Sequence, residues 1–314
     1  MSTAAGHQAS GLSQAIRGPQ ITAQSWTLES AYAYCARLTR SHYENFPVGS
    51  VLVPARLRKH FYSIYAFART ADDFADEAYN EGHGEQERLD LLEEWREMLR
   101  SAHAGRATHP VFMALADTIA QFELPLNLFE DLLTAFAQDV IVRRYQAFDQ
   151  VLHYCRLSAN PIGRLILLLF GHTGPQFHSW SDDICTALQL ANHWQDVRVD
   201  LEKDRIYLPS EDLARFAVTE DDLRAERASD GFRRLMEFEV GRARDLFERG
   251  KPVCTSVGGR LGLELRAVWL GGTRILQRIE QNGFDVLAKR PIITTTDKLG
   301  ILVGAAAKAG FGRY

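Results

Sequence analysis

Apolar residues recur at helical spacing along almost the whole chain, and the stretches that interrupt this pattern are short. In 86–101 leucines stand at helical spacing among dense charges, which is typical of a surface helix. The same spacing predicts further helices over 126–143, 181–201, 230–250 and 262–281. Runs of β-branched residues with a period of two are nearly absent. The sequence therefore predicts an all-α protein, with one domain over 25–314 behind a loose tail over 1–24.

Two local signals predict where helices begin. Pro54 is placed in the first turn of a helix that leads through Ala68 to an acidic segment. Ser181, followed by Asp182 and Asp183, resembles an N-cap with an acidic first turn.

Composition limits the classes of function. The 314 residues are 46% hydrophobic and 24% charged, as in an ordinary globular protein. A formal net charge of −4, with no basic run of five or more, gives no case for a nucleic-acid partner. No segment reaches the roughly 18 apolar residues of a membrane span, and the first residues lack the apolar stretch of a signal peptide. The four cysteines, which form no CxxC pair, predict reduced thiols in a cytoplasmic protein: Cys35, Cys155, Cys185 and Cys254.

Two pairs of aspartates carry the strongest chemical signal. Asp72 and Asp76 stand four residues apart, and so do Asp196 and Asp200. On an α-helix this spacing places both carboxylates of a pair on one face, while Asp73 is turned by about 100° from Asp72. Two such helices facing each other would direct four carboxylates into one cavity. Because Mg²⁺ prefers oxygen ligands and commonly bridges carboxylates to phosphates, the pairs predict an enzyme that binds a phosphorylated substrate through metal.

The residues around the first pair favour a buried helix over a solvated acidic helix end, the alternative reading. Aromatic residues, including Phe61 and Tyr65, occupy the preceding turns, and acids on a buried helix need a partner or a metal. Arg69 lies one turn before Asp73, where its planar guanidinium could orient a carboxylate or bind a phosphate.

The second pair belongs to a longer polar stripe on its predicted helix. The stripe consists of Gln189, Asn192, Asp196 and Asp200. Apolar residues at the other positions favour a cavity wall over an exposed stripe. Lys203, Arg205 and Tyr207 follow directly, and cations there could neutralise a diphosphate as it leaves.

Taken in order, these motifs resemble the squalene and phytoene synthase family. The resemblance spans roughly 32–287 and rests on a DDxxD-like helix, YCRLSANPIG, QLANHWQDVRVD and DRIYLP. It implies an isoprenoid (terpenoid) synthase fold, a single helical bundle around a central cavity. It also implies that the two aspartate motifs bind Mg²⁺ and the diphosphate of a prenyl substrate.

The resemblance assigns roles to particular positions. It makes Asp72, Asp76, Asp196 and Asp200 the metal-binding acids, with Asn192 in support, Gln189 facing the cavity and Arg69 contacting the diphosphate. The segment SHYENFP matches the family's early diphosphate-contacting segment and adds His42 and Asn45.

Departures from the family pattern indicate a branch. Val199 stands where many members have glutamate, Gln195 where arginine is usual, and Leu157 where the flap segment usually has tyrosine. Pro161 should distort a helix in the same flap. With the segments ENFPVGS and AFARTADDFADE, these departures resemble the hydroxysqualene synthase branch of the hopanoid pathway.

That branch implies a lyase-type reaction on the fold of a transferase family, in squalene and hopanoid biosynthesis. Presqualene diphosphate and water give hydroxysqualene and diphosphate, with Mg²⁺ as cofactor and no nicotinamide cofactor. The functional partners are a presqualene diphosphate synthase and a hydroxysqualene reductase. Asn160 is the candidate for directing the water. A cytoplasmic location is expected, and peripheral contact with the inner membrane face stays open because the substrate is a lipid.

Two alternatives remain. The chain could instead condense two farnesyl diphosphates to presqualene diphosphate, squalene or dehydrosqualene, or two geranylgeranyl diphosphates to phytoene. It could also be a non-catalytic helical assembly subunit, against which the retention of all four motif aspartates argues.

Overall fold

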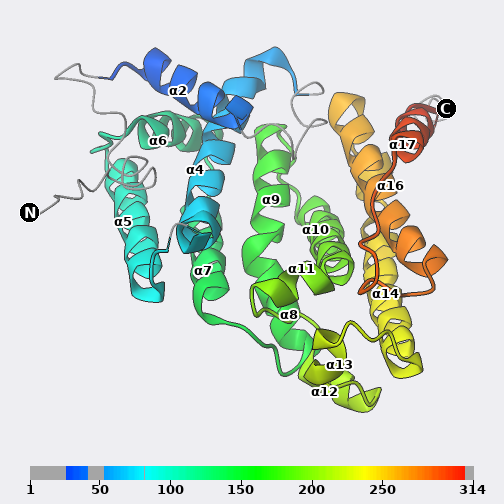
Figure 1. The fold of residues 1–314 in the computed structure, drawn as a ribbon. Helices are drawn as coiled ribbons and strands as arrows, with labels where there is room; N and C mark the ends of the chain where they lie inside the picture. Colours follow the sequence, from blue (N-terminus) through cyan, green and yellow to red (C-terminus); the bar gives the residue numbers. More distant parts are fainter. Residues whose placement is uncertain (1–25, 42–52, 81, 308–314) are drawn as a thin grey trace, which may run out of the picture. The chain divides into compact units, whose positions relative to one another are not determined.

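The computed structural model describes residues 26–41, 53–80 and 82–307 (Figure 1). Every regular element in these ranges is a helix, and the described backbone contains a single isolated bridge, between Arg144 and Ile206. The prediction of an all-α protein is therefore confirmed. The chain divides into two compact units, one with 1–47 and 55–141 and the other with 48–54 and 142–314.

The first unit is built around one long helix. α4 (Ala55–Asn80) packs against the four other described helices of the unit, α2 (Leu28–Ser41), α5 (Glu85–His103), α6 (Pro110–Phe122) and α7 (Leu126–Ile141). Phe67 of α4 lies in an aromatic core with Trp95, Phe112 and Phe129, at ring-centroid distances of 6.3, 6.0 and 5.5 Å. Because these four side chains are at most 1% exposed, they fix α4 firmly in the unit.

A buried polar cluster also joins α4 to its neighbours. The hydroxyl of Tyr32 on α2 donates to Asp117 on α6 at 2.6 Å. His60 and Ser63 of α4 lie 3.0 and 2.9 Å from the hydroxyl of Thr118. Burial, followed by the bond to Asp117, raises the pKa of Tyr32. The cluster satisfies polar groups that would otherwise destabilise the core.

The second unit is centred on α10 (Pro175–Gln195), which packs against α8 (Phe148–Ser158), α9 (Asn160–Leu169), α14 (Asp230–Gly250) and α16 (Gly259–Gln281). Gly163 allows the close approach of α9, because a Cβ there would lie 2.4 Å from Ser181 Oγ. The remaining helices of the unit are α11 (Val197–Glu202), α12 (Ser210–Arg215), α13 (Glu220–Arg224), α15 (Val253–Ser256) and α17 (Thr295–Ala307).

Several predicted boundaries agree closely with the structure. α14 and α7 follow the predicted ranges to within two residues, α4 begins directly after Pro54, and α5 and α16 extend the predicted ranges by one to three residues at an end. Pro161 interrupts the flap as expected: α8 ends before Ala159, and Pro161 lies in the first turn of α9, where its missing N–H costs nothing.

The predicted helix over 181–201 differs from the structure in its start and in its continuity, while its end agrees to one residue. α10 begins at Pro175 after a Gly174 cap, so Ser181 is an interior residue that faces α9 instead of an N-cap. The helix also stops at Gln195, and α11 begins at Val197. A proline in the first turn thus decided the start, and local charge did not. In the part of the chain that the structure describes, none of the helices combines the length and apolar character needed to cross a membrane.

Candidate active site

The first aspartate pair, Asp72 and Asp76, lies on α4, where Arg69 forms ion pairs with Asp72 and Asp73. Arg69 Nη1 lies 3.2 Å from Asp72 Oδ2, and Nη2 lies 2.6 Å from Asp73 Oδ1. The Asp72 side chain is 42% exposed and that of Asp73 only 16%. The structure therefore brings Arg69 onto both carboxylates, and the side chain of Asp72, one turn from Asp76, is the more exposed of the two.

Tyr65 lies one turn before Arg69 on the same helix, and the charges of this cluster affect its pKa. Burial raises the pKa of its phenol, Arg69 opposes that shift, and Asp72 and Asp73 reinforce it. The phenol therefore stays protonated at neutral pH and can act as a hydrogen-bond donor toward the acidic cluster.

The second pair lies where α10 passes into α11. Asp196 forms the junction, and the backbone N–H of Asp200 still donates to the Asp196 carbonyl at 2.9 Å. The helical spacing of the two carboxylates therefore survives the break. Asn192, one turn earlier, is exposed, whereas Gln189 is half-buried.

Asp196 is bound by an arginine that sequence reasoning missed. Both oxygens of Asp196 accept from Arg290, Oδ1 from Nε and Oδ2 from Nη2, the latter at 3.0 Å. This bidentate bond is the main reason that the pKa of Arg290 is raised. The two residues are 94 positions apart, so no local sequence signal could have paired them.

Residues 287–291, here called the strap, are attached to the second motif at further points. Gln195 Nε2 donates to the carbonyl of Pro291 at 2.6 Å, and Arg198 Nη1 donates to that of Leu287 at 3.5 Å. Gln195 is only 8% exposed. The glutamine that departs from the family pattern thus fastens the strap instead of facing solvent.

A buried aromatic and imidazole cluster lies beneath the polar stripe of α10. His193 stacks on Tyr207 with ring centroids 3.6 Å apart, and its Nε2 lies 3.4 Å from Gln189 Nε2. Burial, with a smaller contribution from Arg205, lowers the pKa of His193 to about 3. The imidazole is therefore neutral and can orient the Gln189 carboxamide. The sequence gave His193 no role, because a single histidine within a helix carries no signal of its neighbours.

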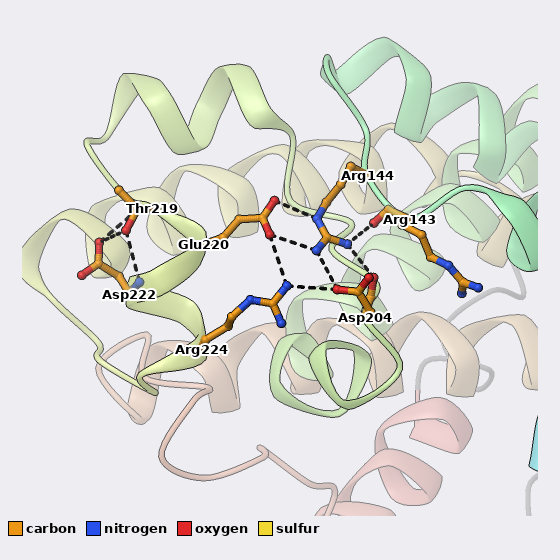
Figure 2. A network of polar contacts seen from close by, with 7 residues as sticks. All are labelled: Arg143, Arg144, Asp204, Thr219, Glu220, Asp222 and Arg224. Atoms are coloured by element: carbon orange, nitrogen blue, oxygen red, sulfur yellow. Dashed lines mark hydrogen bonds and ion pairs between the residues drawn. The ribbon is translucent and has the colours of Figure 1, made fainter.

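A charged network around Arg144 holds the segment that precedes Arg205 and Tyr207, and Figure 2 shows its members Arg144, Asp204, Glu220 and Arg224. Arg144 pairs with Asp204 at 2.8 Å and with Glu220 at 2.8 Å, and Arg224 pairs with the same Asp204 oxygen at 3.0 Å. Hydrogen bonds from Arg144 are the leading cause that lowers the pKa of both Asp204 and Glu220. The network fixes the loop that carries Arg205 and Tyr207, which are both buried.

The remaining predicted residues lie in different surroundings. Leu157 is half-buried in the last turn of α8, and Lys203 is half-buried at the end of α11. Asn160 is 5% exposed, and its Oδ1 accepts from Thr186 Oγ1 on α10 at 3.0 Å, so its side chain joins α9 to α10. His42 and Asn45 lie outside the described residues.

The donor atoms of each pair, taken separately, suit a magnesium ion that also binds a substrate phosphate. Among the described residues no group of three or more His, Cys, Asp or Glu side chains could hold a metal by itself. Each pair instead offers carboxylate oxygens on one helical face. Mg²⁺ commonly takes one or two carboxylates together with water and substrate phosphates instead of an all-protein cage. Within the first unit the acids that would hold such an ion are Asp72 and Asp76, and within the second unit they are Asp196 and Asp200.

Comparison with known proteins places these motifs in a family. The hydroxysqualene synthase of Rhodopseudomonas palustris is 34% identical over 277 residues, 86% of this chain and 91% of the relative. The phytoene synthase of Arthrospira platensis is 29% identical over 296 residues, 90% and 94% of the two chains. The crystal structure of the squalene synthase HpnC from Alicyclobacillus acidocaldarius is 45% identical with a TM-score of 0.78, over 82% of this chain and 96% of that one.

This structural likeness confirms the predicted all-α isoprenoid synthase fold. The squalene/phytoene synthase family model matches residues 39–297, a range that contains both aspartate motifs, the flap and the strap. The chain therefore belongs to the squalene/phytoene synthase family.

Proposed function

We propose that this chain converts presqualene diphosphate and water into hydroxysqualene and diphosphate. The observation that carries the proposal is its likeness to squalene-branch relatives: 45% identity to the Alicyclobacillus squalene synthase and 34% to the Rhodopseudomonas hydroxysqualene synthase. The phytoene synthase of Arthrospira, at 29%, is similar over a comparable length and sets the main alternative.

The structure of the second motif supports a distinct branch. The side chain of Gln195 is hydrogen-bonded to the Pro291 carbonyl of the strap, and Val199 is 39% exposed. Of the two positions that depart from the family pattern, Gln195 therefore fastens the motif to the strap, whereas Val199 faces solvent. Leu157, in the flap, removes a hydroxyl from the half-buried end of α8.

In the proposed reaction the chain supplies binding and charge. Mg²⁺, when bound, would neutralise the diphosphate and make it a better leaving group. Asp72, Asp76, Asp196 and Asp200 would hold the ion, with Asn192 in support. Arg69, together with Lys203 and Arg205, would offset negative charge on the departing diphosphate.

The carbon–oxygen bond to diphosphate breaks with its electron pair, and the remaining cyclopropylcarbinyl cation rearranges. Water then forms a new carbon–oxygen bond and releases a proton. Neutral Gln189 and its partner His193 offer polar contacts that need no charged base, because the protonated alcohol that forms is a very strong acid. No electrons are consumed, so the reaction needs no nicotinamide cofactor.

In a hopanoid pathway the chain would act between two other enzymes. A presqualene diphosphate synthase would supply the substrate, and a reductase would consume the alcohol. Each link follows from the chemistry of the substrate and the product.

Product analysis tests the proposal. The purified chain is incubated with Mg²⁺ and presqualene diphosphate, farnesyl diphosphate or geranylgeranyl diphosphate, in separate reactions without a reductant. Of the three substrates, we expect only presqualene diphosphate to give hydroxysqualene. When the water is labelled with ¹⁸O, we expect the label in the alcohol. Phytoene from geranylgeranyl diphosphate, or presqualene diphosphate from farnesyl diphosphate, would overturn the assignment. Turnover that survives the double change Asp72→Asn and Asp196→Asn would overturn the assigned metal ligands.

A further inference from the structure

Helix α17 turns its large aliphatic side chains toward solvent. Leu299 is 65% exposed, Leu302 55% and Val303 61%, and Ile292 just before the helix is 52% exposed. These four residues are here called the α17 face. Among the described residues seven large hydrophobic side chains are exposed, and four of them belong to this face. Scattered exposure is ordinary, but such a concentration marks an interaction surface.

The inward side of α17 shows that this orientation is fixed by specific contacts. Asp297, with a side chain only 1% exposed, pairs with Arg274 at 2.6 Å and with Arg278 at 2.7 Å on α16. Arg266 donates to the carbonyl of Ala305 at 3.0 Å. Rotating the helix to bury its leucines would break the ion pairs of the buried Asp297 carboxylate. Leaving a buried charge without its partners is strongly unfavourable.

Small residues complete the inward side. Ala305 is 1% exposed, and a Cβ at Gly304 would lie 3.4 Å from Leu270 of α16. A surface helix normally packs its aliphatic side chains inward and exposes its polar ones. α17 instead exposes large aliphatic side chains, and nothing in the described part of the chain covers them.

The charges around the α17 face are suited to an anionic surface. Over 289–307 the only carboxylate is that of Asp297, which is buried and paired, while Lys289 and Lys298 are exposed. Exposed aliphatic side chains bordered by basic residues are the pattern of helices that lie in a membrane interface.

We propose that the α17 face binds the surface of a lipid bilayer and prefers one with anionic lipids. The choice of a bilayer over a protein rests in part on the proposed function, whose substrate and product are both long-chain lipids that partition into membranes. The face would hold the enzyme where its substrate resides. A second copy of the chain on the same face is the competing occupant, and the experiment below separates the two.

Vesicle flotation of the full chain, without substrate, tests the proposal. The probe is phosphatidylcholine vesicles with and without phosphatidylglycerol, at low and high salt. We expect the chain to float with the anionic vesicles and to lose this binding as salt rises. The triple change Leu299→Ser, Leu302→Ser and Val303→Ser should weaken binding about tenfold or more, since each replaces exposed aliphatic surface. Lys298→Glu should weaken binding to the anionic vesicles more than to the neutral ones.

Ile141→Ser provides the matched control, because Ile141 is 50% exposed but lies on α7 in the other unit. It should float like the unchanged chain. The triple variant should keep its unfolding midpoint, because the replaced side chains face solvent. Absence of flotation by the unchanged chain, or equal flotation by the triple variant, would overturn the proposal. So would a loss of self-association in the triple variant, by light scattering, with unchanged vesicle binding.

The test is independent of catalysis. Should the chain bind vesicles through α17 but make no alcohol, only the proposed function would fail. Should it make alcohol from detergent-dispersed substrate but ignore vesicles, only the membrane proposal would fail.

Discussion

Asp196 is a motif acid whose charge is compensated by a bidentate arginine of its own unit. The guanidinium of Arg290 binds both of its oxygens, and the Asp196 side chain is 13% exposed. A cation that approaches Asp196 therefore meets a competing positive charge. Arg290 should weaken the binding of a divalent ion when no diphosphate is present.

The change Arg290→Gln tests this competition. Removing the competing charge should lower the dissociation constant for Mn²⁺, used in place of Mg²⁺, by about three- to tenfold. Electron paramagnetic resonance of free Mn²⁺ measures this without substrate. Arg233→Gln, which removes a comparable partner from Asp285, is the control and should leave the constant unchanged. Unchanged affinity in Arg290→Gln would show that the pair does not compete with metal.

A second prediction at this scale concerns the flap. Leu157→Tyr would restore a hydroxyl near the end of α8, where Leu157 is half-buried. We expect the fraction of alcohol among the products to fall severalfold, because the shape and polarity of the pocket that quenches the cation would change. Mass spectrometry of the lipid extract measures the ratio, with Leu157→Met as the conservative control. A ratio identical to that of the unchanged chain would remove Leu157 from the proposed determinants.

Single residues also show what sequence could and could not predict about the site. Asp72 with Asp76, and Asp196 with Asp200, were found because helical spacing relates each pair locally. Arg290 was not found, because its contact joins positions far apart in the chain. The hydrogen bond from Gln195 to Pro291 could not be predicted for the same reason. The sequence shows that Gln195 departs from the family pattern, but only the structure shows this bond.

Helix–helix packing in the second unit contains a buried acid that the proposed chemistry does not use. Glu239 of α14 is fully buried, and Arg242 lies 2.9 Å from its Oε1 and 2.6 Å from Asp212 of α12. Burial is the main cause that raises the pKa of Glu239 to about 8, with Arg242 opposing and Asp212 reinforcing the shift. Two buried carboxylates thus share one guanidinium, and Glu239 holds a proton at neutral pH.

This raised pKa predicts how stability varies with pH. The usual pKa of a glutamate is about 4.3, so between about pH 4.5 and 8 the folded state binds more protons at Glu239 than the unfolded state. The free energy of unfolding should therefore fall as pH rises through this window. Glu239→Gln should remove that loss, so the variant should be at least about 1 kcal/mol more stable than the unchanged chain at pH 9 and similar at pH 5.

Urea unfolding at several pH values measures the difference. Glu237→Gln changes an exposed acid of the same helix and should leave the pH dependence as it was. A constant difference between Glu239→Gln and the unchanged chain from pH 5 to 9 would contradict the buried, protonated state of Glu239.

Elements were predictable where apolar periodicity was long and unbroken. The range of α14 follows from that spacing to the residue, and that of α16 differs only by three residues at its start. The start of α10 was mistaken, because Ser181 with two acids imitates a cap while Pro175 six residues earlier sets the true first turn. The break at Asp196 could not be read from the sequence, since the residues on both sides favour helix and the strap contacts that surround it come from far along the chain.

At the scale of the whole molecule, periodicity predicted the all-α class, and the motif order predicted the family. The sequence could not predict that the aliphatic residues of α17 would face outward. Their spacing alone suits a buried face, and the buried pairing of Asp297 with Arg274 and Arg278 turns that face to solvent. Tertiary ion pairs thus override the local rule in the segment where we propose contact with lipid.

Ligand-linked stability provides the last prediction, because a ligand that binds only the folded chain raises the midpoint of unfolding. If the motif acids bind diphosphate through metal, Mg²⁺ and inorganic pyrophosphate together should stabilise the chain more than either alone. At about a hundred times the dissociation constant the gain is about 2.7 kcal/mol, or roughly 5 °C for a chain of this size.

Differential scanning fluorimetry with Mg²⁺, pyrophosphate, both, and both with a chelator measures the shift. Asp72→Asn and Asp196→Asn, one in each unit, should each reduce it, whereas the control changes Asp90→Asn and Glu248→Gln alter exposed acids outside the motifs and should keep it. A full shift from pyrophosphate in the presence of chelator would mean that Arg69, Arg205 and other cations bind the anion without metal. A shift that both aspartate variants retain would mean that metal binds elsewhere. Only a shift that requires metal, pyrophosphate and both motifs agrees with the proposed role of the four aspartates.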